Sequence, residues 1–238
     1  MTPNEDERNK KLDLFYDIIT ENDKIRSQNV SVKRKSIHIK VIDDVETTVS
    51  YLESYSLENE CHKTSILLLA GQSFTSTIWT ETKAMQIFST MGYHCVAIDL
   101  PGTGKTTGDL VNDRYKGIFI SKLLDELGLG SVAVVVASMS GSYIVPILPD
   151  RRIITIIAVG VSDTKVDEAN RRLIPTPCLI MWGERDITLG PLSQKHLKVL
   201  KVTKEVIVPR SFHACYESNP NDFQKIVLNW ISWVVKNY

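Results

Sequence analysis

Long hydrophobic runs, closely spaced cysteine pairs and an excess of either charge are missing from this sequence of 238 residues. No stretch approaches the roughly 18 consecutive apolar residues that a membrane-spanning helix needs. Residues 1–11 are charged and rich in amides, so they lack the apolar segment of a signal peptide. We therefore expect a protein of the cytoplasm, with the nucleus as a further location, and no membrane as a partner.

The charges are balanced along the chain. The 28 Lys and Arg residues equal the 28 Asp and Glu residues in number, and no long block has one sign. A nucleic-acid-binding protein usually presents a basic surface, which this distribution does not predict. We expect no nucleic acid as a partner, and the sequence does not identify a protein partner.

Cysteine is scarce, and the spacing of the four residues does not match a metal-binding motif. None of the four forms a CxxC motif, and three lie in or beside apolar runs. This pattern favours free thiols over disulfides or a zinc site, so we expect no bound metal. The four are Cys61, Cys95, Cys178 and Cys215.

Continuous runs of Val, Ile and Leu alternate with helical segments after residue 64. Such runs are typical of strands that are buried on both faces of a sheet. Before them, residues 36–41 and 45–52 alternate in hydrophobicity, which predicts an antiparallel hairpin. The order predicts a doubly wound α/β sheet with an antiparallel start. The later strands are expected at residues 65–69, 93–98, 132–136, 153–159, 178–182 and 205–208.

Helical periodicity completes this architecture. A short amphipathic helix is predicted within residues 8–27, and others near residues 80–90, 113–127, 141–148, 190–200 and 221–236. We therefore divide the chain into an N-terminal helical extension, residues 1–35, and a single α/β domain, residues 36–238. The last helix is the clearest, with an apolar stripe formed by Phe223, Ile226, Val227, Trp230, Ile231 and Val234.

A glycine-rich loop at residues 99–108 superficially resembles a phosphate site. The form GxxxxGK[ST] needs a glycine five residues before Gly104, but Asp99 occupies that position, and its carboxylate would repel phosphate. GxGxxG also fails, because Thr107 stands where its third glycine belongs. We interpret the loop as a tight turn built on Gly102 and Gly104.

Three serines follow the strand at residues 132–136, and a strand, a sharp turn and a helix are what a nucleophile elbow requires. The positions two before and two after the nucleophile must be small. Ser138 is preceded by Val136 and Ser142 is followed by Ile144, whereas Ser140 has small residues on both sides. We therefore expect Ser140 to be the nucleophile; the alternative is a serine-rich helix N-cap.

A serine nucleophile needs a base and an acid that orients it, in the chain order Ser, Asp or Glu, His. His213 is the one histidine that follows the final predicted strand, so it is the expected base. Asp186 is the preferred acid, because it lies shortly beyond a strand end and can turn towards His213. Glu184 in the same loop and Asp163 after the preceding strand are alternatives, and residues 184–186 could instead form a solvated turn.

Two backbone N–H groups should stabilise the oxyanion. One belongs to the residue after the nucleophile, which is Gly141 if Ser140 reacts. The other comes from the loop after the strand at residues 65–69, where we expect Gln72.

Several motifs together resemble the α/β-hydrolases, and more closely the α/β-hydrolase domain-containing protein 14 family, over roughly residues 36–238. The most specific are the elbow with a serine two before the expected nucleophile and the HACY ending at residues 213–216. Ala70 departs from the histidine that commonly precedes this glycine, and residues 142–145 depart from the family pattern. The other motifs are LLLAGQ (67–72) with Trp79, GYHCVAIDLPGTG (92–104), SMSGSY (138–143) with Pro146, and WGERD (182–186).

The resemblance implies an α/β-hydrolase fold with a mostly parallel eight-stranded sheet and helices on both faces. Residues 162–176 are too few for a cap domain, so none is expected. It also implies Ser140, His213 and Asp186 as a catalytic triad that hydrolyses acyl esters through an acyl-enzyme, with no required cofactor. The family is also connected with removal of acyl groups from lysine with coenzyme A as acceptor, which is one alternative. A non-catalytic binding protein of this fold is another.

Overall fold

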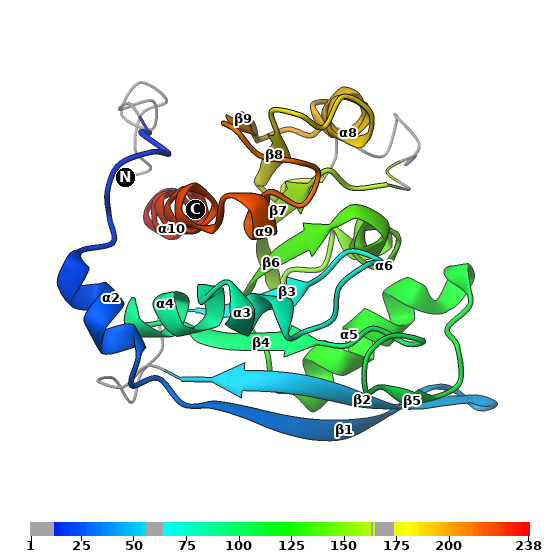
Figure 1. Ribbon diagram of the computed structural model, residues 1–238. Helices are drawn as coiled ribbons and strands as arrows, with labels where there is room; N and C mark the ends of the chain where they lie inside the picture. The colour runs from blue at the N-terminus through cyan, green and yellow to red at the C-terminus, as the bar shows by residue number, and fades with distance from the viewer. Residues whose placement is uncertain (1–11, 56–63, 163, 165–173) are drawn as a thin grey trace.

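One mostly parallel sheet forms the centre of the protein (Figure 1). The computed structural model describes residues 12–55, 64–162, 164 and 174–238. Within these residues eight strands follow the order β1-β2-β4-β3-β6-β7-β8-β9, and β5 pairs with β2. The sheet confirms the predicted architecture, although the short β5 was not predicted. The bounds are β1 Val32–Ile42, β2 Val45–Ser54, β3 Ser65–Leu69, β4 His94–Ile98, β5 Thr107–Gly108, β6 Val132–Ala137, β7 Ile153–Val159, β8 Cys178–Gly183 and β9 Thr203–Val208.

Helices cover both faces of the sheet (Figure 1). The α3, α4 and α10 side chains pack on one face, and those of α5, α6 and α8 pack on the other. The bounds are α2 Glu21–Ser27, α3 Ile78–Glu81, α4 Ala84–Thr90, α5 Lys116–Glu126, α6 Gly141–Ile144, α8 Leu189–Leu197, α9 Cys215–Ser218 and α10 Pro220–Asn237, with short 3-10 helices η1 Asp113–Tyr115, η2 Ser138–Ser140 and η3 Val145–Ile147.

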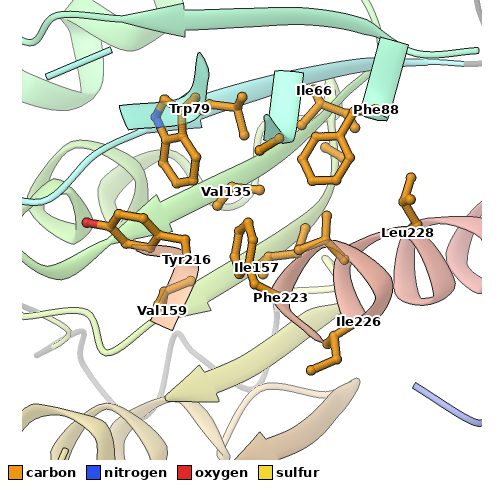
Figure 2. Close-up of a cluster of buried hydrophobic side chains, with 14 of the residues drawn as sticks. Ile66, Trp79, Phe88, Val135, Ile157, Val159, Tyr216, Phe223, Ile226 and Leu228 are labelled. Carbon is orange, nitrogen blue, oxygen red and sulfur yellow. The ribbon is translucent and has the colours of Figure 1, made fainter. Parts of the chain in front are cut away.

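The alternation of side chains along each strand explains the continuous apolar runs. In β3, Ile66 and Leu68 face the core beneath α4 and α10, whereas Leu67 and Leu69 face the core beneath α5. Because both faces are covered, a central strand has no polar face. Figure 2 shows the first core, in which side chains of α10 meet those of α4 and of the central strands.

Helix α10 carries the predicted stripe into this core. All six stripe residues are at most 1% exposed. The indole of Trp230 also donates a hydrogen bond of 2.8 Å from Nε1 to Oγ1 of Thr155 in β7. The helix is thus fixed to the middle of the sheet by both apolar burial and a polar contact.

The helix predicted within residues 8–27 is largely wrong for its described part. Of residues 12–27, only Glu21–Ser27 are helical. Thr20 starts this helix, because its side chain accepts from the backbone of Asp23 while the Asp23 carboxylate accepts from the backbone of Thr20. The preceding segment is held differently: Leu14 is buried, and its carbonyl accepts from Asn229 Nδ2 at 3.2 Å.

Other helix and strand boundaries also differ from the predicted ones. The helix expected near residues 80–90 is divided by Lys83, which has a φ of +63°. Strand β1 begins at Val32, within the residues assigned to the N-terminal extension. The division of the chain into an extension and one domain stays a prediction, as does the absence of a cap, since most of residues 162–176 lie outside the described residues.

The glycine loop adopts the predicted tight turn around a buried carboxylate. Asp99 accepts from the backbone N–H of Ser76 at 2.7 Å and of Lys105 at 2.9 Å, and it pairs with Arg34 at 3.2 Å. Gly104 has a φ of +53°, and a Cβ there would lie 2.4 Å from the Asp99 carboxyl. The loop therefore wraps around its own aspartate.

Three of the four cysteines lie in the described part of the chain, and all three are buried free thiols. Cys61 lies outside it. Burial raises the pKa of Cys95 and of Cys215 to about 12. Among the described residues, no helix is both long enough and apolar enough to cross a bilayer.

Candidate active site

The loops that carry the candidate residues lie at one edge of the sheet. Strands β6, β7, β8 and β9 are parallel neighbours, with Ala137 paired to Val159 and Gly183 paired to Val208. Their carboxyl ends therefore lie at the same edge, as the course of the strands in Figure 1 shows. Ligands of open α/β sheets bind at this edge.

The sharp turn after β6 is centred on Ser138. Strand β6 ends at Ala137, and Ser138 has a φ of +51°, a backbone conformation that L-residues other than Gly, Asn and Asp rarely adopt. Such strain is characteristic of a nucleophile elbow. Ser138 is partly buried and lies directly beyond the end of the strand.

Ser140 occupies a different position from the one expected of a nucleophile. It has a relaxed φ of −64°, is completely buried, and its hydroxyl donates a hydrogen bond to the carbonyl of Ala70. The two serines therefore differ in backbone conformation and in exposure, and the assignment of Ser140 stays a prediction. Val136, which seemed too large to stand two residues before a nucleophile, packs into the core that also contains the side chains of α5. A second signal favoured Ser138: it lies closer to the strand end.

His213 and Asp186 are brought together as predicted. His213 Nδ1 lies 2.5 Å from Oδ2 of Asp186, which is 5% exposed. The other oxygen, Oδ1, accepts from the backbone N–H of Leu189 at 3.0 Å and of Thr188 at 3.2 Å. The carboxylate thus fixes the orientation of the imidazole and leaves Nε2 at the opposite side of the ring.

The pKa of Asp186 reflects these contacts. Burial by itself raises it, but the hydrogen bonds from His213 and from the backbone N–H groups of Gly190 and Thr188 outweigh burial, so the pKa lies below its usual value. The carboxyl group is therefore ionised at neutral pH and can stabilise a protonated imidazole.

Backbone contacts hold the Asp186 and His213 loops together. Arg185 N–H donates to the carbonyl of Ser211 at 2.9 Å. Gly183 permits this contact, because a Cβ there would lie 2.0 Å from the Phe212 carbonyl oxygen. The alternative acid Glu184 is exposed and accepts from Arg210 N–H at 2.7 Å, so it braces the loop instead. Asp163 lies outside the described residues.

The segment after β7 lies between the elbow and the Asp186–His213 pair. On one side, Ser162 N–H donates to the carbonyl of Ser138 at 3.0 Å. On the other, a Cβ at Gly160 would lie 2.9 Å from His213 Cε1 and 3.0 Å from Asp186 Oδ2. One short segment therefore contacts all three groups.

Of the two expected oxyanion donors, Gln72 and Gly141, the structure leaves only Gln72 available. Among the described residues the Gln72 N–H has no hydrogen-bond partner. The Gly141 N–H instead points back into the turn, towards the carbonyls of Ser138 and Met139. Met139 directly follows Ser138 in the first turn of η2, where backbone N–H groups lack intrahelical partners.

Comparison with known proteins identifies relatives over most of the chain. ABHD14B of Homo sapiens is 31% identical over 174 residues, which cover 70% of this chain and 82% of that protein. Protein ABHD14A of Danio rerio is 31% identical over 174 residues, 70% of this chain and 64% of that protein. No protein-family model matches.

Solved structures share the fold at lower identity. A CIB-like hydrolase of Thermoplasma acidophilum superposes with a TM-score of 0.72 at 23% identity, covering 84% of this chain and 99% of that one. Carboxylesterase CesB of Bacillus subtilis gives 0.67 at 14% identity, covering 84% and 92%. With its sheet order, strained elbow and related sequences, this chain belongs to the ABHD14 family of the α/β-hydrolase fold.

Proposed function

We propose that this protein is a serine hydrolase that cleaves small acyl esters through Ser138, His213 and Asp186. The observation that carries the proposal is the His213–Asp186 pair at 2.5 Å, at the same sheet edge as the strained Ser138. Esterases among the proteins of similar structure support the reaction class. No cofactor is required, because water is the final acceptor.

In this mechanism the Ser138 hydroxyl attacks the acyl carbon while Nε2 of His213 takes its proton. Asp186 stabilises the resulting imidazolium, and the backbone N–H groups of Met139 and Gln72 donate to the oxyanion. Collapse of the tetrahedral intermediate expels the alcohol, which receives the proton from His213. Water then attacks the acyl-enzyme by the same route and regenerates Ser138.

Labelling with a fluorophosphonate, followed by mass-spectrometric mapping, tests the nucleophile. Wild-type protein should be modified at Ser138, and Ser138→Ala should not be labelled. Ser140→Ala should still be labelled at Ser138. A modification that persists in Ser138→Ala and maps to another residue contradicts the assignment.

Hydrolysis of p-nitrophenyl acetate tests the reaction. Wild-type activity should disappear in both Ser138→Ala and His213→Ala. Equal turnover by wild type and both variants contradicts catalysis at this site and favours a non-catalytic binding protein.

A second activity is proposed because the name of the relative ABHD14B contains the words protein-lysine deacylase. Here Ser138 attacks the amide carbonyl of an acyl-lysine, and the C–N bond breaks as the lysine amine leaves with a proton from His213. The thiol of coenzyme A then attacks the acyl-enzyme in place of water, which forms the thioester and regenerates Ser138. An acyl-lysine peptide is incubated with wild type and with Ser138→Ala, each with and without coenzyme A. Acyl-coenzyme A formed only by wild type supports transfer, whereas unchanged peptide contradicts this second activity.

A further inference from the structure

The peptide group between Ala70 and Gly71 is held at both of its polar atoms by side-chain hydroxyls. Its carbonyl oxygen accepts from the hydroxyl of Ser140, and its N–H donates to the hydroxyl of Tyr216 at 3.4 Å. Ser140 belongs to the elbow. Tyr216 is the second residue of α9, the helix that begins directly after His213 and Ala214. Three of the loops at the candidate site, those after β3, β6 and β9, therefore meet at one peptide group.

Both hydroxyls are rigidly placed. Ser140 is completely buried in the elbow. Tyr216 is 2% exposed, and its ring contacts Trp79 with 4.7 Å between ring centroids, and Phe223 with 6.0 Å. Figure 2 shows the Tyr216 ring in this aromatic cluster. Because both side chains are packed in the core, their hydrogen bonds restrain the position of the Ala70–Gly71 peptide group.

The peptide group between Gly71 and Gln72 is also restrained, but only at its carbonyl oxygen. The carbonyl of Gly71 accepts from Phe74 N–H at 3.0 Å, while the N–H of Gln72 in the same peptide group has no partner among the described residues. Of the four polar atoms in these two peptide groups, only the Gln72 N–H lacks a partner among the described residues. A donor fixed before the reaction needs no reorganisation when the oxyanion forms.

We propose, on the basis of the proposed function, that Ser140 and Tyr216 are positioning residues that clamp the Ala70–Gly71 peptide and thereby orient the Gln72 N–H towards the oxyanion. Neither hydroxyl touches the reacting atoms. The clamp acts on the transition state, because negative charge develops on the substrate oxygen only as the tetrahedral oxyanion forms and is absent from the bound ester. Loss of a clamp member should lower kcat and leave KM unchanged.

The test compares Ser140→Ala, Tyr216→Phe and the double variant by steady-state hydrolysis of p-nitrophenyl acetate. Each single variant should lose ~10- to 100-fold in kcat, the range expected when a catalytic group is displaced by about 1 Å. Because both hydroxyls hold one peptide group, the double variant should lose less than the product of the single losses. Ser193→Ala is the matched control, since Ser193 is also completely buried and its hydroxyl has no partner in the described structure. It should keep wild-type kcat.

A second measurement separates the clamp from the proposed function. Amide hydrogen exchange at Gly71 should accelerate in Tyr216→Phe and Ser140→Ala, and stay at the wild-type rate in Ser193→Ala. If wild type neither turns over the ester nor is labelled at Ser138, the proposed function fails, and the exchange rates alone decide whether the clamp exists. Wild-type kcat in both single variants, or unchanged exchange at Gly71, overturns the clamp.

Discussion

Gly71 lies so close to Ser138 that a β-carbon at position 71 would be 3.2 Å from the Cβ of Ser138. That distance is tighter than ordinary van der Waals contact, and the hydroxyl of Tyr216 stands 3.4 Å from the same point. The loop after β3 and the elbow after β6 therefore approach each other at a residue that has no side chain. This close approach connects the proposed nucleophile with the proposed oxyanion donor.

Gly71→Ala should reduce kcat at least ~10-fold, because the added methyl pushes the Gln72 loop away from Ser138. Steady-state kinetics measures the effect. Gly130→Ala is the matched control, since nothing lies within 4 Å of a Cβ at that position. Equal kcat in Gly71→Ala and the control contradicts the prediction.

Gly160→Ala should abolish most of the activity. Gly160 has a φ of +50°, and a Cβ there would lie within 3.0 Å of both His213 and Asp186. The substitution adds about 1–2 kcal/mol of backbone strain and separates the imidazole from its carboxylate. We expect a loss of ~100-fold or more in kcat, with fluorophosphonate labelling slowed in parallel. Labelling at the wild-type rate contradicts the argument.

The lowered pKa of Asp186 predicts a pH dependence of stability. A carboxyl group whose pKa is lower in the folded than in the unfolded protein stabilises the fold above its unfolded pKa, which is about 3.9 for Asp. This stabilisation disappears as the pH falls through the folded value. The free energy of unfolding in urea should therefore differ between wild type and Asp186→Asn at pH 7, and the difference should shrink below about pH 4.

Glu184→Gln is the control for this measurement, because Glu184 is an exposed carboxyl group in the same loop that contacts a backbone N–H and not the imidazole. The difference in the free energy of unfolding between wild type and Glu184→Gln should change less between pH 7 and pH 4 than the difference between wild type and Asp186→Asn. A gap between wild type and Asp186→Asn that widens on acidification contradicts the direction argued here.

Asp99→Ala should destabilise the fold by about 1–3 kcal/mol, because Ser76 N–H and Lys105 N–H lose a buried acceptor and Arg34 loses its partner. Urea unfolding measures the change. Asp43→Ala removes a carboxylate whose side chain is 98% exposed and should change stability by no more than about 0.5 kcal/mol. Similar values for the two variants contradict a structural role for Asp99.

Much of the fold could be predicted from residue patterns because burial on both faces leaves a direct signature. The runs at residues 65–69 and 153–159 coincide with β3 and β7 as observed. The stripe of α10 was predicted residue by residue for the same reason. The N-terminal helix was not, because its apolar residues repeat at helical spacing while the Thr20–Asp23 capping box starts the helix later.

The site divides in a similar way. The sequence by itself predicted that His213 and Asp186 belong together, because each follows a strand of the parallel part of the sheet and the carboxyl ends of such strands share an edge. Only the tertiary structure supplied the observations on which we propose Ser138 instead of Ser140. Their chemistry is identical, and the difference lies in the positive φ of Ser138 and in the Ala70 carbonyl that accepts from Ser140. Both depend on contacts with loops after β3 and β7, which are distant in sequence and leave no local pattern around either serine.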